Sequence, residues 1–159
     1  MASFVSKKVI LNYKQTNHAP PEKVFPLLCP VREKDWLDGW EYKMIHSNSG
    51  IAEEGCVFST PHHGEAETIW IVTKYNPVDF EIAFARLTPG ESVVRISIKL
   101  AVFDTNSTNA FIEYEYTSLS AEQSNYLENK VEKDFKDSML WWEKSINYYL
   151  KTGELLLKT

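Results

Sequence analysis

The sequence contains little cysteine. Its 159 residues include only Cys29 and Cys56, and the two do not form a C-x-x-C motif. Two thiols are too few for a disulfide framework, so we expect both to be reduced and buried. A chain of this length buries roughly 70% of its unfolded surface and forms a core without crosslinks. We therefore expect one domain spanning residues 1–159.

Long apolar runs are also missing. No stretch of about 18 apolar residues occurs, so the sequence predicts no transmembrane segment. The first residues, MASFVSKKVILNYK, lack the apolar core of a signal peptide. Both observations favour a cytoplasmic location.

Positive charge is sparse and scattered. The formal net charge is −5, and Lys7 and Lys8 are the only adjacent basic residues. Because binding to phosphate backbones needs a basic face, we expect no nucleic-acid partner. The sequence also lacks G-x-G-x-x-G, G-x-x-x-x-G-K-[ST], H-E-x-x-H and G-x-S-x-G motifs, so we expect no cofactor and assign no catalytic residues.

Aromatic residues are abundant. The chain is 43% hydrophobic and 25% charged, and it contains five Trp, eight Tyr and eight Phe. This composition is typical of a globular protein. So many large rings must line a core, a pocket or a partner surface.

Apolar and polar residues alternate over most of the chain, in the pattern of half-buried strands. Turn signals divide the alternating segments, and the short connections predict an antiparallel meander. The clearest alternation sets Val94, Ile96, Ile98, Leu100 and Val102 against polar neighbours. We expect seven strands, at about 3–14, 41–47, 51–60, 65–75, 79–88, 91–103 and 109–118.

Three helices complete the predicted α+β arrangement. The prolines in APPEKVFPLL favour short or broken helices after the first strand, and a second short helix or turn is expected at 32–40. A long helix is expected at about 121–152, with Ser120 and Gln123 as a capping box and Gly153 at its end. Its apolar residues recur at steps of three and four; they are Leu127, Val131, Phe135, Met139, Trp142, Ile146 and Tyr149.

The long helix is the only element able to cover the dry face of the sheet. A helix is about 10–12 Å wide with its side chains, and a broad curved sheet encloses more space than that. The remaining concave, mostly apolar space is typical of a ligand site. We therefore expect a cavity for a small apolar molecule between the sheet and the helix.

Four phrases of the sequence, together with the order of elements, resemble the START-related (SRPBCC) superfamily. They are APPEKVFPLL, REKDWLDGWEY, TIWIVTKYNP and WWEKSINYYLKTGE. The superfamily includes birch-pollen-allergen and polyketide-cyclase-like proteins, which bind lipids, sterols, hormones or polyketides. The resemblance implies a helix-grip fold, in which a seven-stranded curved antiparallel sheet surrounds a long C-terminal helix and two short helices follow the first strand.

Several aromatic residues are candidates for the cavity wall. Trp36 and Trp40 could gate its mouth, although aromatic residues at this spacing more often anchor a helix on a sheet. Tyr114 and Tyr116 share the dry face of the last strand, where a phenol can hydrogen-bond a ligand. The alternative is that both are core residues with their hydroxyls satisfied at the rim.

Trp70, Phe84 and Arg86 lie in strands with apolar residues on both faces, so the inward face is not determined by the pattern. If Phe84 points inward, Arg86 does too, and it then needs a carboxylate or an anionic ligand. Glu65 or Glu67 could supply the carboxylate. The alternative, which we favour, is a solvent-facing cross-strand ion pair.

His63, Glu65 and Glu67 alternate along one predicted strand and would point to one side. Such a set could bind a divalent metal or act as an acid–base pair. The simpler interpretation, an exposed turn followed by solvated carboxylates, is favoured, and we assign no metal site.

Polar residues flank the apolar stripe of the long helix. Asp134 is expected on the wet side, paired with Lys130, whereas Ser138 could point into the cavity. Met139 and Trp142 are expected mainly to fill the core and secondarily to line the cavity. The full set of predicted ligand-binding residues is Trp36, Trp40, Trp70, Phe84, Arg86, Tyr114, Tyr116, Ser138, Met139 and Trp142.

The sequence thus favours a non-catalytic protein that binds or transports a small apolar ligand, such as a lipid or polyketide. One alternative is a cyclase, hydratase or hydrolase, which needs a titratable residue inside the cavity. Another is a protein-interaction module, which needs an exposed apolar patch around Trp36, Trp40 or Leu155–Leu157. The sequence does not identify a protein partner.

Overall fold

The computed structural model describes residues 4–62 and 66–159, and these form strands and helices in the predicted order. The strands are β1 (Lys8–Asn17), β2 (Lys43–His46), β3 (Val57–Pro61), β4 (Glu67–Asn76), β5 (Glu81–Thr88), β6 (Ser92–Asp104) and β7 (Ser107–Ser118). The α-helices are α1 (Pro21–Val24), α2 (Pro30–Trp36), α3 (Ala121–Asn129) and α4 (Val131–Thr152), and a 3₁₀ helix, η1, spans Phe25–Leu28.

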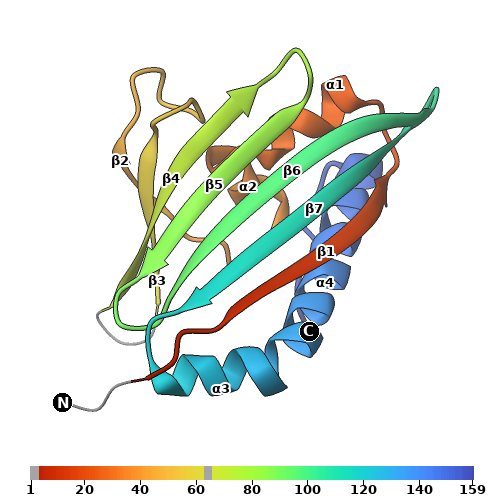
Figure 1. Ribbon diagram of the computed structural model, residues 1–159. Helices are drawn as coiled ribbons and strands as arrows, with labels where there is room; N and C mark the ends of the chain where they lie inside the picture. Colours follow the sequence, from red (N-terminus) through yellow and green to blue (C-terminus); the bar gives the residue numbers. More distant parts are fainter. Residues whose placement is uncertain (1–3, 63–65) are drawn as a thin grey trace.

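The seven strands form one antiparallel sheet in the order β1-β7-β6-β5-β4-β3-β2. Strands β2 to β7 follow one another as a meander, because each connection is short enough only for a neighbouring antiparallel strand. The first strand joins the far edge beside β7. Figure 1 shows the strands bending together as a curved sheet, with α1, α2 and α4 behind it.

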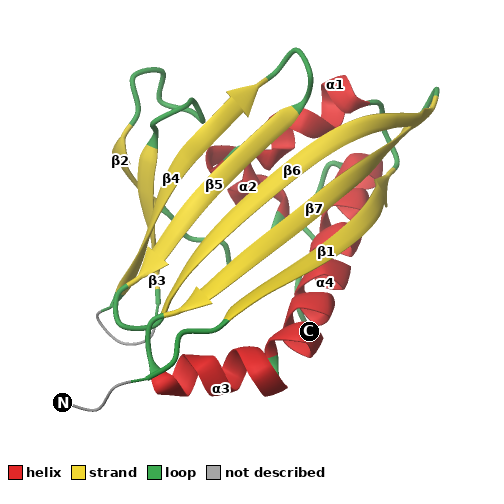
Figure 2. Cartoon of the chain, viewed as in Figure 1, coloured by secondary structure: helices red, strands yellow, loops and turns green. Residues whose placement is uncertain are grey.

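Alternation of side chains gives this sheet a dry inner face and a wet outer face. On β6, Val94, Ile96, Ile98 and Leu100 are buried, whereas the residues between them are exposed. The inner face packs against α4, whose buried residues include Phe135, Met139 and Ile146. As Figure 2 shows, the helices lie on one side of the sheet only, so the other side is left to solvent.

Three local expectations are wrong. The predicted single helix at 121–152 breaks at Lys130, whose φ of −130° is not helical, so α3 and α4 are separate. The strand expected at 51–60 begins only at Val57, because residues 54 and 55 form a turn. Val102, expected on the dry face, is 68% exposed because the β6–β7 hairpin extends beyond the core.

Both predicted ends of the helical region are confirmed. The hydroxyl of Ser120 accepts a hydrogen bond from the Gln123 backbone N–H at 3.2 Å, as an N-cap does. Gly153 has a φ of +74° and ends α4 by donating its N–H to the Tyr149 carbonyl at 2.7 Å. Glycine adopts this left-handed conformation without steric cost, so the chain turns back along α4 here.

Candidate functional site

A cavity of about 520 Å³ lies between the inner face of the sheet and α4. Its walls come from α2, the loop after it, strands β3 to β7, α4 and the C-terminal tail. Residues from opposite sides of the fold meet there; they include Glu33, Trp40, Phe58, Trp70, Phe84, Arg86, Ile96, Ile98, Tyr114, Ser138, Met139, Trp141, Trp142 and Lys158. The curved sheet and the helix therefore leave space that protein atoms do not fill.

Aromatic rings form one wall of the cavity. Phe58 and Trp70 stack with ring centroids 5.4 Å apart, and Phe84 meets Trp70 edge-on at 5.9 Å. Trp40 closes this group from the loop after α2, with its ring centroid 6.0 Å from that of Trp70. Rings in such stacked and edge-to-face contacts form a well-packed apolar wall that a ligand can contact.

Arg86 lies on the inner face of β5. Its register partner on β4 is Trp70, and the guanidinium carbon lies 5.2 Å from the centroid of that ring and 5.6 Å from the Tyr114 ring. Phe84, two residues earlier, is buried on the same face. The structure thus determines the orientation that the sequence left open: Phe84 and Arg86 both point inward.

The predicted ion pair of Arg86 is wrong. Its neighbours across the strands are Trp70 and Val94, and among the described residues no carboxylate pairs with it. Glu67 lies on the outer face and accepts a hydrogen bond from Ser59 at 3.4 Å. Two further hollows, of about 340 and 580 Å³, share Arg86 with the cavity as a wall residue. The guanidinium is therefore reached from several sides.

Glu33 on α2 is the residue that the sequence interpretation missed. Its carboxyl group lines the cavity and has no hydrogen-bond or ion-pair partner among the described residues. Burial raises the pKa of Glu33 from 4.5 to about 8, because the charged form is poorly solvated there. The only sequence signal is its position one turn before the buried Trp36, on the same face of α2.

Tyr114 and Tyr116 lie on the inner face of β7, as predicted, with ring centroids 5.9 Å apart. Tyr114 lines the cavity, and burial raises the pKa of its hydroxyl; the Arg86 charge opposes this shift and Glu33 adds to it. Tyr116 lines only the adjoining hollow, where burial likewise raises its pKa. At neutral pH both phenols are protonated and available as hydrogen-bond donors.

Trp36 does not gate the cavity. Its side chain is 0% exposed, its Nε1 donates to the Leu27 carbonyl at 2.9 Å, and its ring meets Trp142 edge-on at 5.1 Å. It anchors α2, which was the favoured interpretation, and so the apolar patch considered around it for a protein-interaction module does not form. Trp40 differs, because it reaches the cavity while its Nε1 donates to the Pro30 carbonyl at 2.8 Å.

Asp134 and Ser138 lie at the open side of α4. Asp134 accepts a hydrogen bond from the Tyr126 hydroxyl at 2.8 Å, so the expected pairing with Lys130 is wrong. Ser138 is exposed and lines both the cavity and the adjoining hollow. Met139 is buried and, with Trp142, lines the cavity.

The C-terminal tail crosses the mouth of the cavity. Leu156 forms a parallel β-bridge with Leu37, and the backbone N–H of Lys158 donates to Asp38 Oδ2 at 2.9 Å. The Lys158 ammonium group lies 5.3 Å from the centroid of the Trp141 ring, on α4. These contacts join the tail to the walls on both sides of the opening.

Other candidate chemistry finds little support in residues 4–62 and 66–159. Within these ranges no group of three His, Cys, Asp or Glu side chains is placed to bind a metal. His63 and Glu65 lie outside the described residues. Cys29 and Cys56 are free and buried, as expected, and no helix in these ranges is both long and apolar enough to cross a bilayer.

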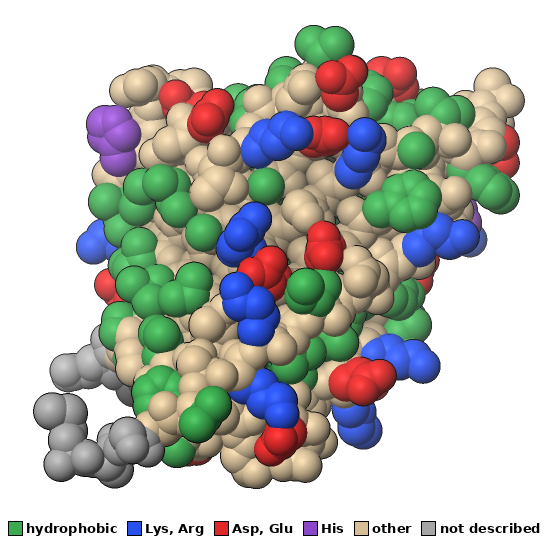
Figure 3. All heavy atoms as spheres, in the orientation of Figure 1, with side chains coloured by type: hydrophobic (Ala, Val, Ile, Leu, Met, Phe, Trp, Pro, Cys, Tyr) green, Lys and Arg blue, Asp and Glu red, His purple; other side chains and the backbone are tan. Residues whose placement is uncertain are grey.

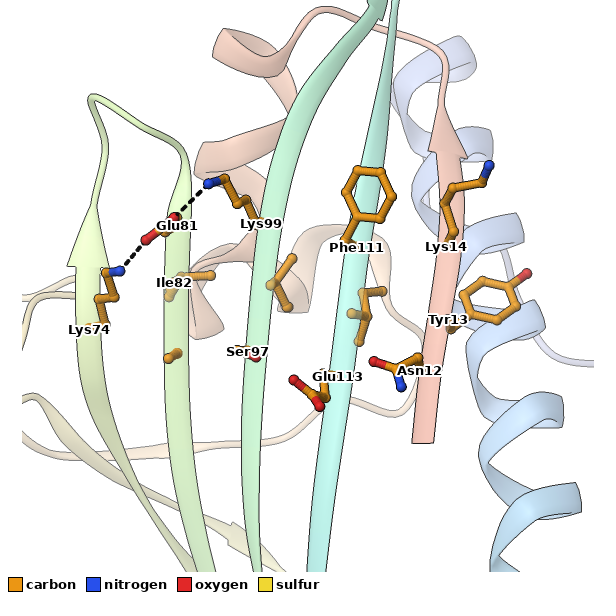
Figure 4. A pocket seen from close by; sticks show the side chains of 13 residues that line it. Asn12, Tyr13, Lys14, Lys74, Glu81, Ile82, Ser97, Lys99, Phe111 and Glu113 are labelled. Carbon is orange, nitrogen blue, oxygen red and sulfur yellow. Dashed lines mark ion pairs between the residues drawn. The ribbon is translucent and has the colours of Figure 1, made fainter. Parts of the chain in front are cut away.

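Another hollow, of about 480 Å³, lies on the outer face of the sheet. Lysine and glutamate side chains surround it: Lys74 and Lys99 both form ion pairs with Glu81, as Figure 4 shows. The outer face is dotted with such charges of both signs (Figure 3). It is therefore a solvated surface, and its hollow is not enclosed by a covering element.

The sequence matches no protein-family model and no curated protein. Solved structures do match. The chain superimposes on Ara h 8.0201 with a TM-score of 0.65 at 14% identity, covering 92% of this chain and 99% of that one. Zhui aromatase/cyclase from Streptomyces sp. R1128 gives 0.68 at 12%, covering 94% and 100%. Norcoclaurine synthase from Thalictrum flavum, in complex with dopamine and hydroxybenzaldehyde, gives 0.67 at 12%, covering 91% and 87%.

At these identities the likeness shows the fold alone. The chain has the START-related helix-grip fold, as the sequence phrases predicted. Proteins of this fold include ligand binders as well as cyclases, so the fold is compatible with either activity.

Proposed function

We propose that this chain, a protein of the helix-grip fold, binds a small, largely apolar molecule in the cavity between its sheet and α4. The observation that carries the proposal is the cavity itself, about 520 Å³ in volume and walled mainly by aromatic and aliphatic side chains. Ligand pockets of drug-sized molecules have this size and this apolar lining.

Three features support binding in this cavity rather than elsewhere. The rings of Phe58, Trp70 and Phe84 are fixed by mutual contact, so a ligand finds a preformed surface. The tail borders the cavity, because Lys158 lines it and the backbone N–H of Lys158 donates to Asp38 on the opposite wall. The neighbour from Thalictrum flavum holds two aromatic molecules, which is consistent with such a ligand here.

Fluorescence titration with N-phenyl-1-naphthylamine tests the proposal. This neutral dye becomes bright in apolar surroundings, and we expect saturable binding on the order of 10 µM to one site. A matched pair of variants locates the dye. Ser138→Trp places a large ring at the cavity opening, and Ser97→Trp places the same ring on the outer face.

We expect Ser138→Trp to weaken dye binding about tenfold or more and Ser97→Trp to leave it unchanged. Both serines are exposed, so neither substitution disturbs the core. Weakening by Ser97→Trp alone would assign the dye to the outer hollow and overturn the proposal. Absence of saturable binding would overturn it as well.

The position of Glu33 favours one second candidate, an enzyme that moves a proton on a bound apolar carbonyl compound. A carboxyl group whose pKa burial raises to about 8 is poised to accept and return a proton near neutral pH. Tyr114 lines the same cavity, where its hydroxyl is a donor for the carbonyl oxygen.

Deuterium exchange tests this candidate. In D₂O, 1-(2-naphthyl)propan-2-one exchanges the hydrogens next to its carbonyl once a base removes one of them. We expect the wild-type protein to accelerate exchange and Glu33→Gln to abolish the acceleration while still binding the ketone. Equal exchange rates with and without protein would leave the protein as a binder only.

A further inference from the structure

We infer that the ligand is a flat, largely aromatic molecule with one anionic oxygen group, and that Arg86 binds this group. The inference rests on the binding function proposed above and names the chemical class of its ligand. A carboxylate, a sulfonate or an ionised enol presents the same oxygen geometry to a guanidinium.

The first observation is the placement of Arg86. Its guanidinium lies between the faces of Trp70 and Tyr114, at 5.2 and 5.6 Å from their centroids. These contacts hold the planar group at the cavity wall and leave its N–H edge free. A guanidinium has five donors in a fixed fork, and ring faces satisfy none of them as oxygen acceptors do.

The second observation is that its protein partner is missing. Within residues 4–62 and 66–159, no hydrogen bond or ion pair engages the Arg86 guanidinium. A half-buried cation without a counter-charge is costly unless an anion completes the pair. Other cations on this chain, such as Lys133 and Lys99, do have carboxylate partners.

The remaining charges of the cavity do not cancel Arg86. Asp137 pairs with Lys133 at 2.7 Å, and Asp38 binds the backbone N–H of Lys158 rather than Arg86. Glu33 has no hydrogen-bond or ion-pair partner among the described residues, and burial raises its pKa to about 8, so at pH 7 it is mostly neutral. A neutral carboxyl group repels no anion and donates a hydrogen bond of its own.

The third observation concerns the shape of the ligand. Arg86 lies over the Trp70 ring, and Trp70 in turn contacts Phe58 and Phe84. A molecule whose anionic group meets the guanidinium must lay its body along these rings. A flat aromatic body makes the largest contact with them.

Two dyes that differ by one sulfonate test the inference. The anionic dye is 8-anilinonaphthalene-1-sulfonate, and the neutral one is N-phenyl-1-naphthylamine. We expect the wild-type protein to bind the anionic dye about tenfold more tightly. Arg86→Met should remove this preference and change the affinity of the neutral dye less than about threefold, because methionine preserves the apolar stem.

Lys158→Met is the matched control, because it removes a cation from the mouth of the same cavity. We expect it to keep most of the preference. Arg86→Lys should keep part of it, since the charge remains but the fork is lost. Circular dichroism of each variant verifies folding before the titration.

The outcomes separate the two proposals. If the wild-type protein binds both dyes equally, or if only Lys158→Met removes the preference, the role of Arg86 is overturned while the binding function stands. If neither dye binds, the binding function itself fails. Retention of the full preference in Arg86→Met would likewise overturn the inference.

Discussion

Arg86 and Trp70 are register partners on β5 and β4, and the guanidinium carbon of Arg86 lies 5.2 Å from the Trp70 ring centroid. The ring is held in turn by a hydrogen bond from its Nε1 to Thr60 Oγ1 at 3.0 Å. A cation over a fixed indole is a favourable arrangement, worth roughly 0.5–2 kcal/mol. The pair connects the apolar wall of the cavity to a cation that has no carboxylate partner among the described residues.

This relationship predicts that Trp70→Leu weakens binding of the anionic dye more than that of the neutral one. We expect losses of about tenfold and threefold, because the substitution removes both the ring contact and the support of Arg86. Trp70→Phe keeps a ring and should lose less than about threefold for either dye. Fluorescence titration measures all four values, and equal losses for both dyes would contradict the prediction.

The raised pKa of Glu33 predicts that the stability of the protein depends on pH. Its pKa is raised from 4.5 to about 8 in the folded state, so the folded protein retains a proton that the unfolded chain releases. This contribution to the free energy of unfolding is complete below pH 4.5 and is lost as the pH rises to about 8. Because the Glu33 side chain is only half-buried, solvent screens its charge, and we expect a loss of about 2–3 kcal/mol.

Glu33→Gln lacks the titrating group and should not show this loss. Urea unfolding between pH 5 and 9 gives the free energies of both proteins, and their difference should grow with pH up to about pH 8. Parallel curves for the wild-type protein and the variant would show that Glu33 is solvated in the folded state.

Substitution of Trp36 should lower the free energy of unfolding without changing ligand affinity. Trp36→Phe removes the hydrogen bond to Leu27 and leaves a small void, so we expect a loss of about 2–3 kcal/mol in the free energy of unfolding. Trp141→Phe is the matched control for stability, because Trp141 Nε1 is buried without a hydrogen-bond partner among the described residues. Replacing this tryptophan should lower the free energy of unfolding by less than about 1 kcal/mol. A gating role for Trp36 would instead appear as altered dye affinity in the folded variant.

The contacts of the C-terminal tail predict that it slows the release of a bound ligand. A chain that ends at Gly153 lacks the bridge from Leu156 to Leu37 and the bond from Lys158 to Asp38. We expect the dissociation rate of the neutral dye to rise about fivefold or more, with a smaller change in the association rate. Stopped-flow fluorescence measures both rates, and an unchanged dissociation rate would show that the tail does not retain the ligand.

Much of the architecture could be predicted from the sequence, because the strands and helices obey their periods. The alternation at Val94–Leu100 and the stripe on 127–149 each identify a buried face, and only one arrangement covers both. The break at Lys130 could not be foreseen, because no proline or glycine marks it. Apolar periodicity continues through it, from Leu127 to Val131, so the pattern reads as one helix.

The site was harder to predict for a physical reason. On β4 and β5 apolar residues occupy both faces, with Ile69 and Leu87 exposed on the outside, so periodicity does not say where Arg86 points. Glu33 looks like a surface residue in the sequence, since Arg32, Lys34 and Asp35 surround it. Only the three-dimensional arrangement shows that it lines the cavity.

A crystal structure of the protein with N-phenyl-1-naphthylamine would show where the ligand binds. We expect electron density for the dye between the sheet and α4, in contact with Trp70, Met139 and Trp142. Density for the dye only on the outer face near Phe111, with the space beside Met139 filled by side chains, would contradict it.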